Sequence, residues 1–301
     1  MRARRASCAL LAAVLVALAG CTAEQAPPSR TADDAIRFAA YDFSENQTLV
    51  AVYAEAARRA GLPVTVQAGV GTREVLEPAL EQGVVDVVVD YLGTAAGFVG
   101  RASPGPPRTR EELHAELADV LDGRGITVLA AAPAEDQNGF AVTTAFAAAY
   151  GLGKLSELGP LAADLVFGGP PECAERPLCL PGLREVYGLE FAAVRSMPSR
   201  AATVEALVAG EIDVGLLETT DARLGIAPVL LLIDDRSLQP HENVVPLVRT
   251  AVLDRWGDRL RAALDRASEL LTTQQLVRLN RAVEIDGLTP AEAAADWWSA
   301  M

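Results

Sequence analysis

The stretch ALEQGVVDVVVDYLGTA, residues 79–95, decides the fold, and its outline returns as ALVAGEIDVGLLETTDA, residues 206–222. Each stretch starts as the end of a helix, turns at a glycine, continues as an apolar run typical of a buried strand, and ends in a polar loop. Aligning the two places Tyr91 opposite Glu218 and Thr94 opposite Asp221. We expect each half of the protein to present one polar strand end to a shared cleft. Coincidence is the alternative, because such units recur in α/β proteins.

The rest of the chain alternates short apolar runs with helical periodicity, which is typical of an α/β sheet covered by helices. Ligands of such sheets collect at the carboxyl ends of the strands. We predict two α/β lobes joined by two crossovers that act as a hinge. The expected strands are 36–40, 64–68, 85–89, 126–130, 141–144, 165–167, 191–194, 212–217 and 229–233, and the expected helices are 48–60, 73–82, 109–121, 183–187, 202–209 and most of 252–298.

The N-terminal residues have the pattern of a targeting segment. Three arginines precede an apolar run from Cys8 to Ala19, which is shorter than the roughly 20 residues that cross a bilayer. We expect residues 1–20 to be a signal peptide. The sequence LAGC at 18–21 resembles the bacterial lipobox, which implies a lipid on Cys21; an ordinary cleaved signal is the alternative. Residues 21–34 then form a flexible tether, so we expect an extracytoplasmic protein anchored to the bacterial cell membrane by lipid.

The charge of the chain argues against nucleic acid as a partner. Its formal charge is −14, and without the three N-terminal arginines it falls to about −17. Phosphate binding needs clustered lysines and arginines, whereas an acidic surface favours solubility. The roughly 270 residues after the tether are enough for two domains with separate cores.

Two cysteines remain inside the folded part. Cys173 and Cys179 flank AERPL in a loop rich in proline, and in an oxidising compartment such a pair is expected to form a disulfide. Metal binding is the alternative, but the two histidines of the chain, His114 and His241, lie far away in sequence. We therefore expect neither a metal nor another cofactor.

The sequence carries no catalytic motif. It has no GxSxG elbow, no HExxH and no P-loop, and the GVGT of residues 69–72 lacks the further glycine and lysine of a phosphate loop. Paired carboxylates of the glycosidase type are the remaining enzymatic alternative, with Asp90, Glu218 and Glu242 as candidates. We therefore expect no enzymatic activity.

Several segments together carry a resemblance to a known family: AAYDFSENQTL at 39–49, VGTREVLEPALEQGVVDVVVDYLGTA at 70–95, DQNGFAV at 136–142, LPGLREVYGLEF at 180–191, ALVAGEIDVGLLETTD at 206–221 and HENVVPLVR at 241–249. They resemble the solute-binding proteins of ABC-type osmoprotectant importers, which take up glycine betaine, choline and related quaternary amines. The resemblance implies a two-lobed periplasmic-binding-protein fold of type II (Venus-flytrap). One lobe would comprise residues 35–131 and 238–301 and the other 132–237. It also implies a monomer that encloses its ligand at the hinge and delivers it to an ABC permease.

In that family a quaternary ammonium lies among aromatic faces, because ring quadrupoles attract a cation that donates no hydrogen bonds. By this resemblance Tyr91 matches an aromatic residue of the box and Phe140 replaces another. Val204, Glu218 and Glu242 stand where the family often has aromatic residues. The remaining candidates are hydrogen-bonding side chains: Thr72, Thr94, Asn138 and Arg73 as donors, with Tyr41 or Asp42 where the family has a basic or amide residue.

Carboxylates at Asp42, Glu218 and Glu242 would favour a cation with N–H groups, because charge-assisted hydrogen bonds are strong. They would disfavour a ligand with an exposed carboxylate. We therefore expect a small cationic solute, of the glycine betaine and choline type or of another class such as an amino acid, a polyamine or an ergothioneine-like compound. A sensing domain or an enzyme on the same scaffold is the alternative.

Overall fold

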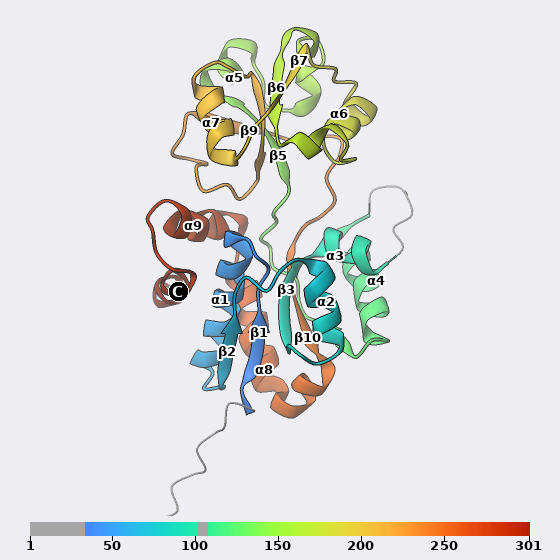
Figure 1. The fold of residues 1–301 in the computed structure, drawn as a ribbon, viewed down its shortest axis with the longest axis vertical. Coiled ribbons are helices and arrows are strands. Elements are labelled where there is room, and N and C mark those ends of the chain that lie inside the picture. Colours follow the sequence, from blue (N-terminus) through green and yellow to red (C-terminus); the bar gives the residue numbers. More distant parts are fainter. Residues whose placement is uncertain (1–33, 101–107) are drawn as a thin grey trace, which may run out of the picture.

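The computed structural model describes residues 34–100 and 108–301. Two lobes lie one above the other and are joined by two chain segments (Figure 1). Each lobe has its own five-stranded sheet. The predicted signal peptide, most of the tether and Cys21 lie outside the described residues. Within the described ranges, no helix is long and apolar enough to cross a membrane.

The sheet of lobe I has the strand order β2-β1-β3-β10-β4. Strands β1, β2 and β3 are parallel, whereas β10 runs antiparallel to β3 and β4. Strand β10 was not expected from the sequence, because Pro246 lies in its middle and proline disfavours central strands. The strands are β1 (Ile36–Ala39), β2 (Val64–Gln67), β3 (Val87–Tyr91), β4 (Ile126–Val128) and β10 (Val244–Arg249).

Helices cover both faces of this sheet (Figure 1). Helix α1 begins at Ser44, four residues earlier than predicted, which brings Glu45 into its first turn. Helix α3 was expected to be a loop, because its GTAAG sequence contains two poor helix formers. The helices are α1 (Ser44–Arg59), α2 (Arg73–Glu81), α3 (Leu92–Val99), α4 (Arg110–Asp122), α8 (Thr250–Leu270), α9 (Thr273–Glu284) and α10 (Pro290–Ser299).

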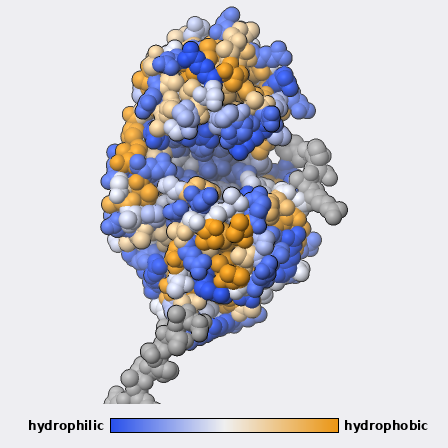
Figure 2. Space-filling model, in the orientation of Figure 1, coloured by the Kyte–Doolittle hydropathy of each residue, from blue (hydrophilic) through white to orange (hydrophobic). Residues whose placement is uncertain are grey.

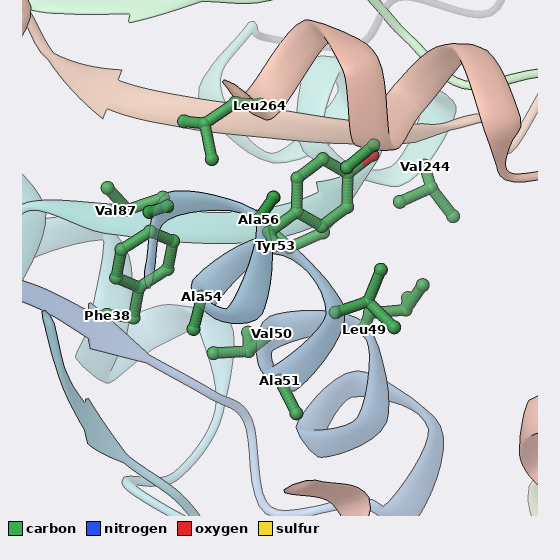
Figure 3. Packing of buried hydrophobic residues seen from close by; sticks show 14 of the residues in the cluster. Phe38, Leu49, Val50, Ala51, Tyr53, Ala54, Ala56, Val87, Val244 and Leu264 are labelled. Atoms are coloured by element: carbon green, nitrogen blue, oxygen red, sulfur yellow. The ribbon is translucent and has the colours of Figure 1, made fainter. Parts of the chain in front are cut away.

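The core of lobe I lies between α1, the sheet and α8 (Figure 3). Leu49 and Tyr53 of α1 are fully buried, together with Phe38 of β1 and Leu264 of α8. The Tyr53 hydroxyl lies 2.9 Å from Ser268 Oγ, so its polar end is satisfied within the core. Burying side chains of this size stabilises the folded state by roughly 1.5–3 kcal/mol each. This packing fixes the position of α1, whose N-terminus points at the other lobe.

Lobe II has the strand order β7-β6-β8-β5-β9. Strands β6, β7 and β8 are parallel, and β5 is antiparallel to its two neighbours. Cys173 and Cys179 form a disulfide with their Cα atoms 5.3 Å apart. The strands are β5 (Asn138–Thr143), β6 (Val166–Gly169), β7 (Ala193–Ser196), β8 (Val214–Glu218) and β9 (Val229–Leu232), and the α-helices are α5 (Thr144–Tyr150), α6 (Leu180–Tyr187) and α7 (Arg200–Val208).

Two crossovers connect the lobes, residues 129–137 on the way out and 233–243 on the way back. They run antiparallel and hydrogen-bond to each other, with Asp136 N donating to Glu242 O at 3.1 Å. Val244 N, at the start of β10, donates to Ala134 O at 2.9 Å. Because the two sheets share no strand and the chain passes between the lobes in these two segments, the pair has the form of a hinge. Strand β3 ends at Tyr91 and strand β8 ends at Glu218, so the two related stretches of sequence both finish near the hinge.

Candidate ligand site between the lobes

A cavity of about 330 Å³ lies between the lobes, where the space-filling view shows a hollow (Figure 2). Both lobes contribute to its wall. Lobe I supplies Phe43, Ser44 and Glu45 from the start of α1, with Asn280 and Glu284 from α9. The crossover and lobe II supply Asp136, Arg200, Glu218, Thr220, Asp221 and Ala222.

Three aromatic rings form a row on the lobe I side of this cavity. The ring of Phe43 stacks with Tyr41 at a centroid distance of 6.0 Å and with Tyr91 at 6.2 Å. Phe43 is 44 % exposed, whereas the tyrosines are 3 % and 7 % exposed. Phe43 is therefore the aromatic face that a solute can reach, and the tyrosines fix its position from either side.

The Tyr91 hydroxyl donates to Glu45 Oε1 at 2.6 Å. Burial, and secondly the charge of Glu45, raise the pKa of Tyr91, so the hydroxyl keeps the proton that it donates. The other carboxylate oxygen, Glu45 Oε2, accepts from Asn280 Nδ2 at 2.6 Å. Asn280 Nδ2 also donates to Thr220 O at 3.0 Å, which joins α9 of lobe I to lobe II. Glu45 thus lies at the centre of a network that spans the hinge.

Asp136 of the outgoing crossover belongs to the same network. Thr220 Oγ1 donates to Asp136 Oδ1 at 2.7 Å. Burial raises the pKa of Asp136 well above its usual range, and the nearby Glu45 raises it further. Burial also raises the pKa of Glu45, against hydrogen bonds from Thr220, Tyr91 and Asn280 that lower it. Both carboxyl groups line the same cavity and neither has an ion-pair partner among the described residues, so one proton on the pair is the favoured state.

Further charged groups lie on the lobe II side. Arg200 Nε donates to both oxygens of Glu218, at 2.6 Å each, and neither side chain is fully buried. Arg223 lies 3.5 Å from Asp221 and 3.9 Å from Glu284, the second of which belongs to lobe I. Five carboxyl groups and one arginine, Arg200, line the cavity, and Arg223 lies behind two of the carboxylates, so the cavity has a negative net charge and favours a cation.

One buried acceptor in the cavity wall lacks a partner. Asn280 is 3 % exposed, and its Oδ1 has no hydrogen bond to any of the described residues. The amide orientation is determined because Nδ2 already serves two acceptors. An unsatisfied buried acceptor costs about 1–3 kcal/mol. The atom is covered in this arrangement, so a solute that donates a hydrogen bond here would remove that cost only after a local shift that uncovers it.

Of the residues singled out in the sequence, Glu218 lines the cavity and Tyr91 and Tyr41 lie behind Phe43. Tyr41 donates to Asp90 Oδ2 at 2.6 Å. Arg73 is paired with the same carboxylate and lies over the Tyr41 ring, 5.4 Å from its centroid. Tyr41 and Arg73 are therefore held by Asp90.

The other expected residues lie elsewhere. Asp42 and Thr72 are exposed in the loops that follow β1 and β2. Glu242 accepts from the backbone N and the hydroxyl of Thr94, at 2.9 and 2.5 Å, and so caps α3. Burial raises the pKa of Glu242 to about 7. The structure does not bring these four residues to the cavity wall.

Asn138 and Phe140 belong to strand β5 and point away from the cavity. Phe140 is 1 % exposed and packs against Phe167 in the core of lobe II, so its ring offers no face to a solute in this arrangement. Asn138 donates to Leu178 O and Gln239 Oε1. Leu178 and Gln239 line a different cavity, of about 590 Å³, beside the crossovers. Phe140 was expected to take the place of one aromatic residue of the box, whereas in this arrangement its ring lies in the core of lobe II.

Sequence reasoning missed Phe43, Glu45, Asp136, Arg200 and Asn280. One signal of the site was available at the start of α1, where an acidic residue follows a phenylalanine, because helix N-termini stabilise negative charge. Asn280 and Glu284 gave another, since residues four apart lie on one helix face. No local pattern places Asn280 beside Glu45, 235 positions away. Among the described residues, no group of histidine, cysteine and acidic side chains could hold a metal ion.

Comparisons with known proteins agree with this architecture. A family model described as the substrate binding domain of the ABC-type glycine betaine transport system matches residues 34–300. The glycine-betaine-binding protein of Pseudomonas aeruginosa is 27 % identical over 274 residues, which cover 88 % of this chain and 87 % of that protein. The glycine betaine-binding protein YehZ of Escherichia coli is 23 % identical over 249 residues, or 79 % and 81 % of the two chains.

Solved structures show the same fold. A crystal structure of a glycine betaine/carnitine/choline ABC transporter superposes with a TM-score of 0.80 at 21 % identity, covering 88 % of this chain and 98 % of that one. Apo YehZ superposes with a TM-score of 0.76 at 20 % identity and the same coverage. The predicted two-lobed α/β fold of the periplasmic-binding-protein type is thereby confirmed. The family is one of transport components and not of enzymes, and this chain belongs to it as a substrate-binding domain of the ABC-type glycine betaine transport family.

Proposed function

We propose that this protein captures a small cation with a hydrogen-bond donor, of which choline is the simplest quaternary example, and delivers it to an ABC permease. The solute would lie in the cavity between the lobes, with its cationic group on Phe43 and against the carboxyl groups of Glu45 and Asp136. Binding of one solute by residues of both lobes would favour the closed arrangement. The lipid on Cys21, attachment to the membrane and a monomeric state belong to the same proposal.

The composition of the cavity wall is the observation that supports this proposal most strongly. It has one reachable aromatic face and more carboxyl groups than arginines. A face of this kind stabilises a cation by about 0.5–2 kcal/mol, and the surrounding negative charge adds to it. The unpartnered Oδ1 of Asn280 favours a solute with a hydroxyl or N–H group. Choline has such a hydroxyl, whereas glycine betaine has no donor.

Glycine betaine itself is the second candidate. The relatives from P. aeruginosa and E. coli are named for it, and Arg200 reaches the cavity. A betaine carboxylate could pair with Arg200, because guanidinium groups bind carboxylates in a bidentate manner. That mode requires Glu218 to release Arg200, which leaves Glu218 without its partner.

A ligand panel tests the proposal. The purified folded part is titrated with choline, glycine betaine, carnitine, ergothioneine, spermidine and arginine, and thermal unfolding and calorimetry are recorded. A specific ligand raises the melting temperature progressively with its concentration, as mass action requires. We expect the largest shift from a cation that carries a donor and a smaller one from glycine betaine. The proposal fails if none of the panel's cations binds, or if glycine betaine binds more tightly than every cation.

A further inference from the structure

We propose that Asp136 is a binding residue for the cationic group, and that it gains its charge only when the solute displaces a proton held between Asp136 and Glu45. This inference rests on the proposed function and deepens it. Solute capture would then be coupled to the release of one proton.

The position of the two carboxyl groups supports this assignment. Glu45 belongs to the first turn of α1 in lobe I, and Asp136 belongs to the outgoing crossover. Both line the interlobe cavity. Glu45 is 7 % exposed, and both its oxygens accept from neutral donors, Tyr91 and Asn280. Asp136 receives one described hydrogen bond, from Thr220, so no described arginine, lysine or histidine forms an ion pair with either group.

The charged groups packed around the pair are mostly committed to each other. From lobe II, Arg200 is paired with Glu218, and Arg223 lies between Asp221 and Glu284 of α9. From β3, Tyr91 faces Glu45 as a neutral hydroxyl. The nearest arginine charges are therefore neutralised by other carboxylates. Two carboxyl groups that line one cavity without a cationic partner retain a proton, because ionising both is opposed by desolvation and mutual repulsion.

Binding of the cation moves one proton from the protein to the solvent. In the free protein Asp136 holds the proton, because burial and then the charge of Glu45 raise the pKa of Asp136. When a permanent cation enters, attraction to the cation compensates the second negative charge. The O–H bond of Asp136 breaks, its electron pair stays on the carboxylate oxygen, and the proton passes to solvent. Burial raises the pKa of Asp136 in the free protein, and the bound cation lowers it, so the affinity increases with pH between these two values.

Calorimetric titration with choline chloride measures this coupling. Titrations are run at several pH values between about 6 and 9, in pairs of buffers with different ionisation enthalpies, so that the number of protons released is obtained directly. At a pH between the two pKa values of Asp136, we expect release of close to one proton per choline bound. The affinity should increase by up to about tenfold per pH unit in that range.

Asp136→Asn is the decisive variant, because the amide keeps the Thr220 hydrogen bond and imitates the protonated acid. It should bind choline without proton release and with an affinity close to that of the wild type at low pH. Asp221→Asn is the matched control: it removes another buried carboxylate of the same cavity, so it should weaken binding at every pH while proton release persists. If the Asp136 variant does not fold, infrared difference spectra of the wild type replace it, and choline should abolish a protonated-carboxyl band.

The outcomes separate the two proposals. If choline binds with no proton release, or with an affinity that does not change with pH, the assignment of Asp136 is overturned while the proposed function stands. Proton release that persists in Asp136→Asn also overturns it. If no cation of the panel binds, the proposed function and this assignment fail together.

Discussion

Tyr91 donates its hydroxyl to Glu45 at 2.6 Å from beneath the cavity. A tyrosine that was expected to offer its ring to the solute therefore positions a carboxylate, while Phe43 in front of it offers the ring. This relationship places the aromatic face and the negative charge on the same wall of lobe I.

Tyr91→Phe tests the role of this hydrogen bond. The variant keeps the ring that stacks on Phe43 but leaves Glu45 with one donor fewer. We expect the free energy of unfolding to fall by about 1–3 kcal/mol, because a buried charged group loses a partner. Urea unfolding measures it. Tyr150→Phe, at an exposed position, should change the stability by less than about 0.5 kcal/mol.

Phe43→Ala tests the aromatic face. Since Phe43 is largely exposed, the stability should change little, whereas choline should bind about 2- to 30-fold more weakly, the equivalent of 0.5–2 kcal/mol. Phe43→Leu separates the causes, because leucine keeps an apolar contact without a ring quadrupole. Calorimetry should find the leucine variant nearly as weak as the alanine variant. Wild-type affinity in Phe43→Ala would rule out a contact between the ring and the cation.

Glu218→Gln tests the acidic wall of lobe II. The substitution removes one negative charge and leaves Arg200 without its counter-ion, so the cavity becomes less attractive to a cation. We expect choline to bind at least about tenfold more weakly, corresponding to about 1.4 kcal/mol. Adding Arg200→Gln should restore part of the affinity. Unchanged choline affinity in Glu218→Gln means that the lobe II carboxylate plays no part in recognition.

Glu242 should make stability depend on pH. Burial raises the pKa of Glu242 to about 7, from 4.5 in the unfolded chain. Between these values the folded protein retains a proton that the unfolded chain has lost, so its stability falls as the pH rises. The Glu242→Gln variant has no titrating group at this position, so its stability lacks this pH dependence. The difference in free energy of unfolding, variant minus wild type, should therefore increase by on the order of 3 kcal/mol from about pH 4 to about pH 8.

A constant difference between the two proteins across this range would contradict the raised pKa of Glu242. Thr94→Val provides a second check, since it removes the hydroxyl that donates to Glu242 and should raise that pKa further.

Much of the fold could be predicted because its signals are local. The apolar runs at 36–40 and 64–68 and the periodic helix residues after Thr48 give the alternation of strands and helices directly. Strand β10 was missed because Pro246 disfavours a central strand, although the antiparallel pairing with β3 still forms around it. Helix α3 was missed because its glycines lower the local helix propensity. The packing of α3 against α4 compensates for that low propensity.

The site was less predictable because it depends on contacts distant in sequence. Glu218 and Tyr91 were found because each ends a strand of its own sheet, and ligands of α/β sheets collect at the carboxyl ends of strands. Arg200 was not recognised as the partner of Glu218, since only the packing of α7 beside β8 brings them together. Asn280 likewise could not be recognised, because it comes from a C-terminal helix that returns to lobe I. Phe140 was expected at the ligand, but its side of β5 faces the core of lobe II.

A crystal structure of the protein with choline would locate the solute. We expect one choline in the cavity between the lobes, with its ammonium group within about 6 Å of the Phe43 ring centroid and beside Asp136. Its hydroxyl should lie within hydrogen-bonding distance of Asn280 Oδ1. Choline bound instead in the cavity beside the crossovers, next to His241 and Gln239, would contradict this expectation.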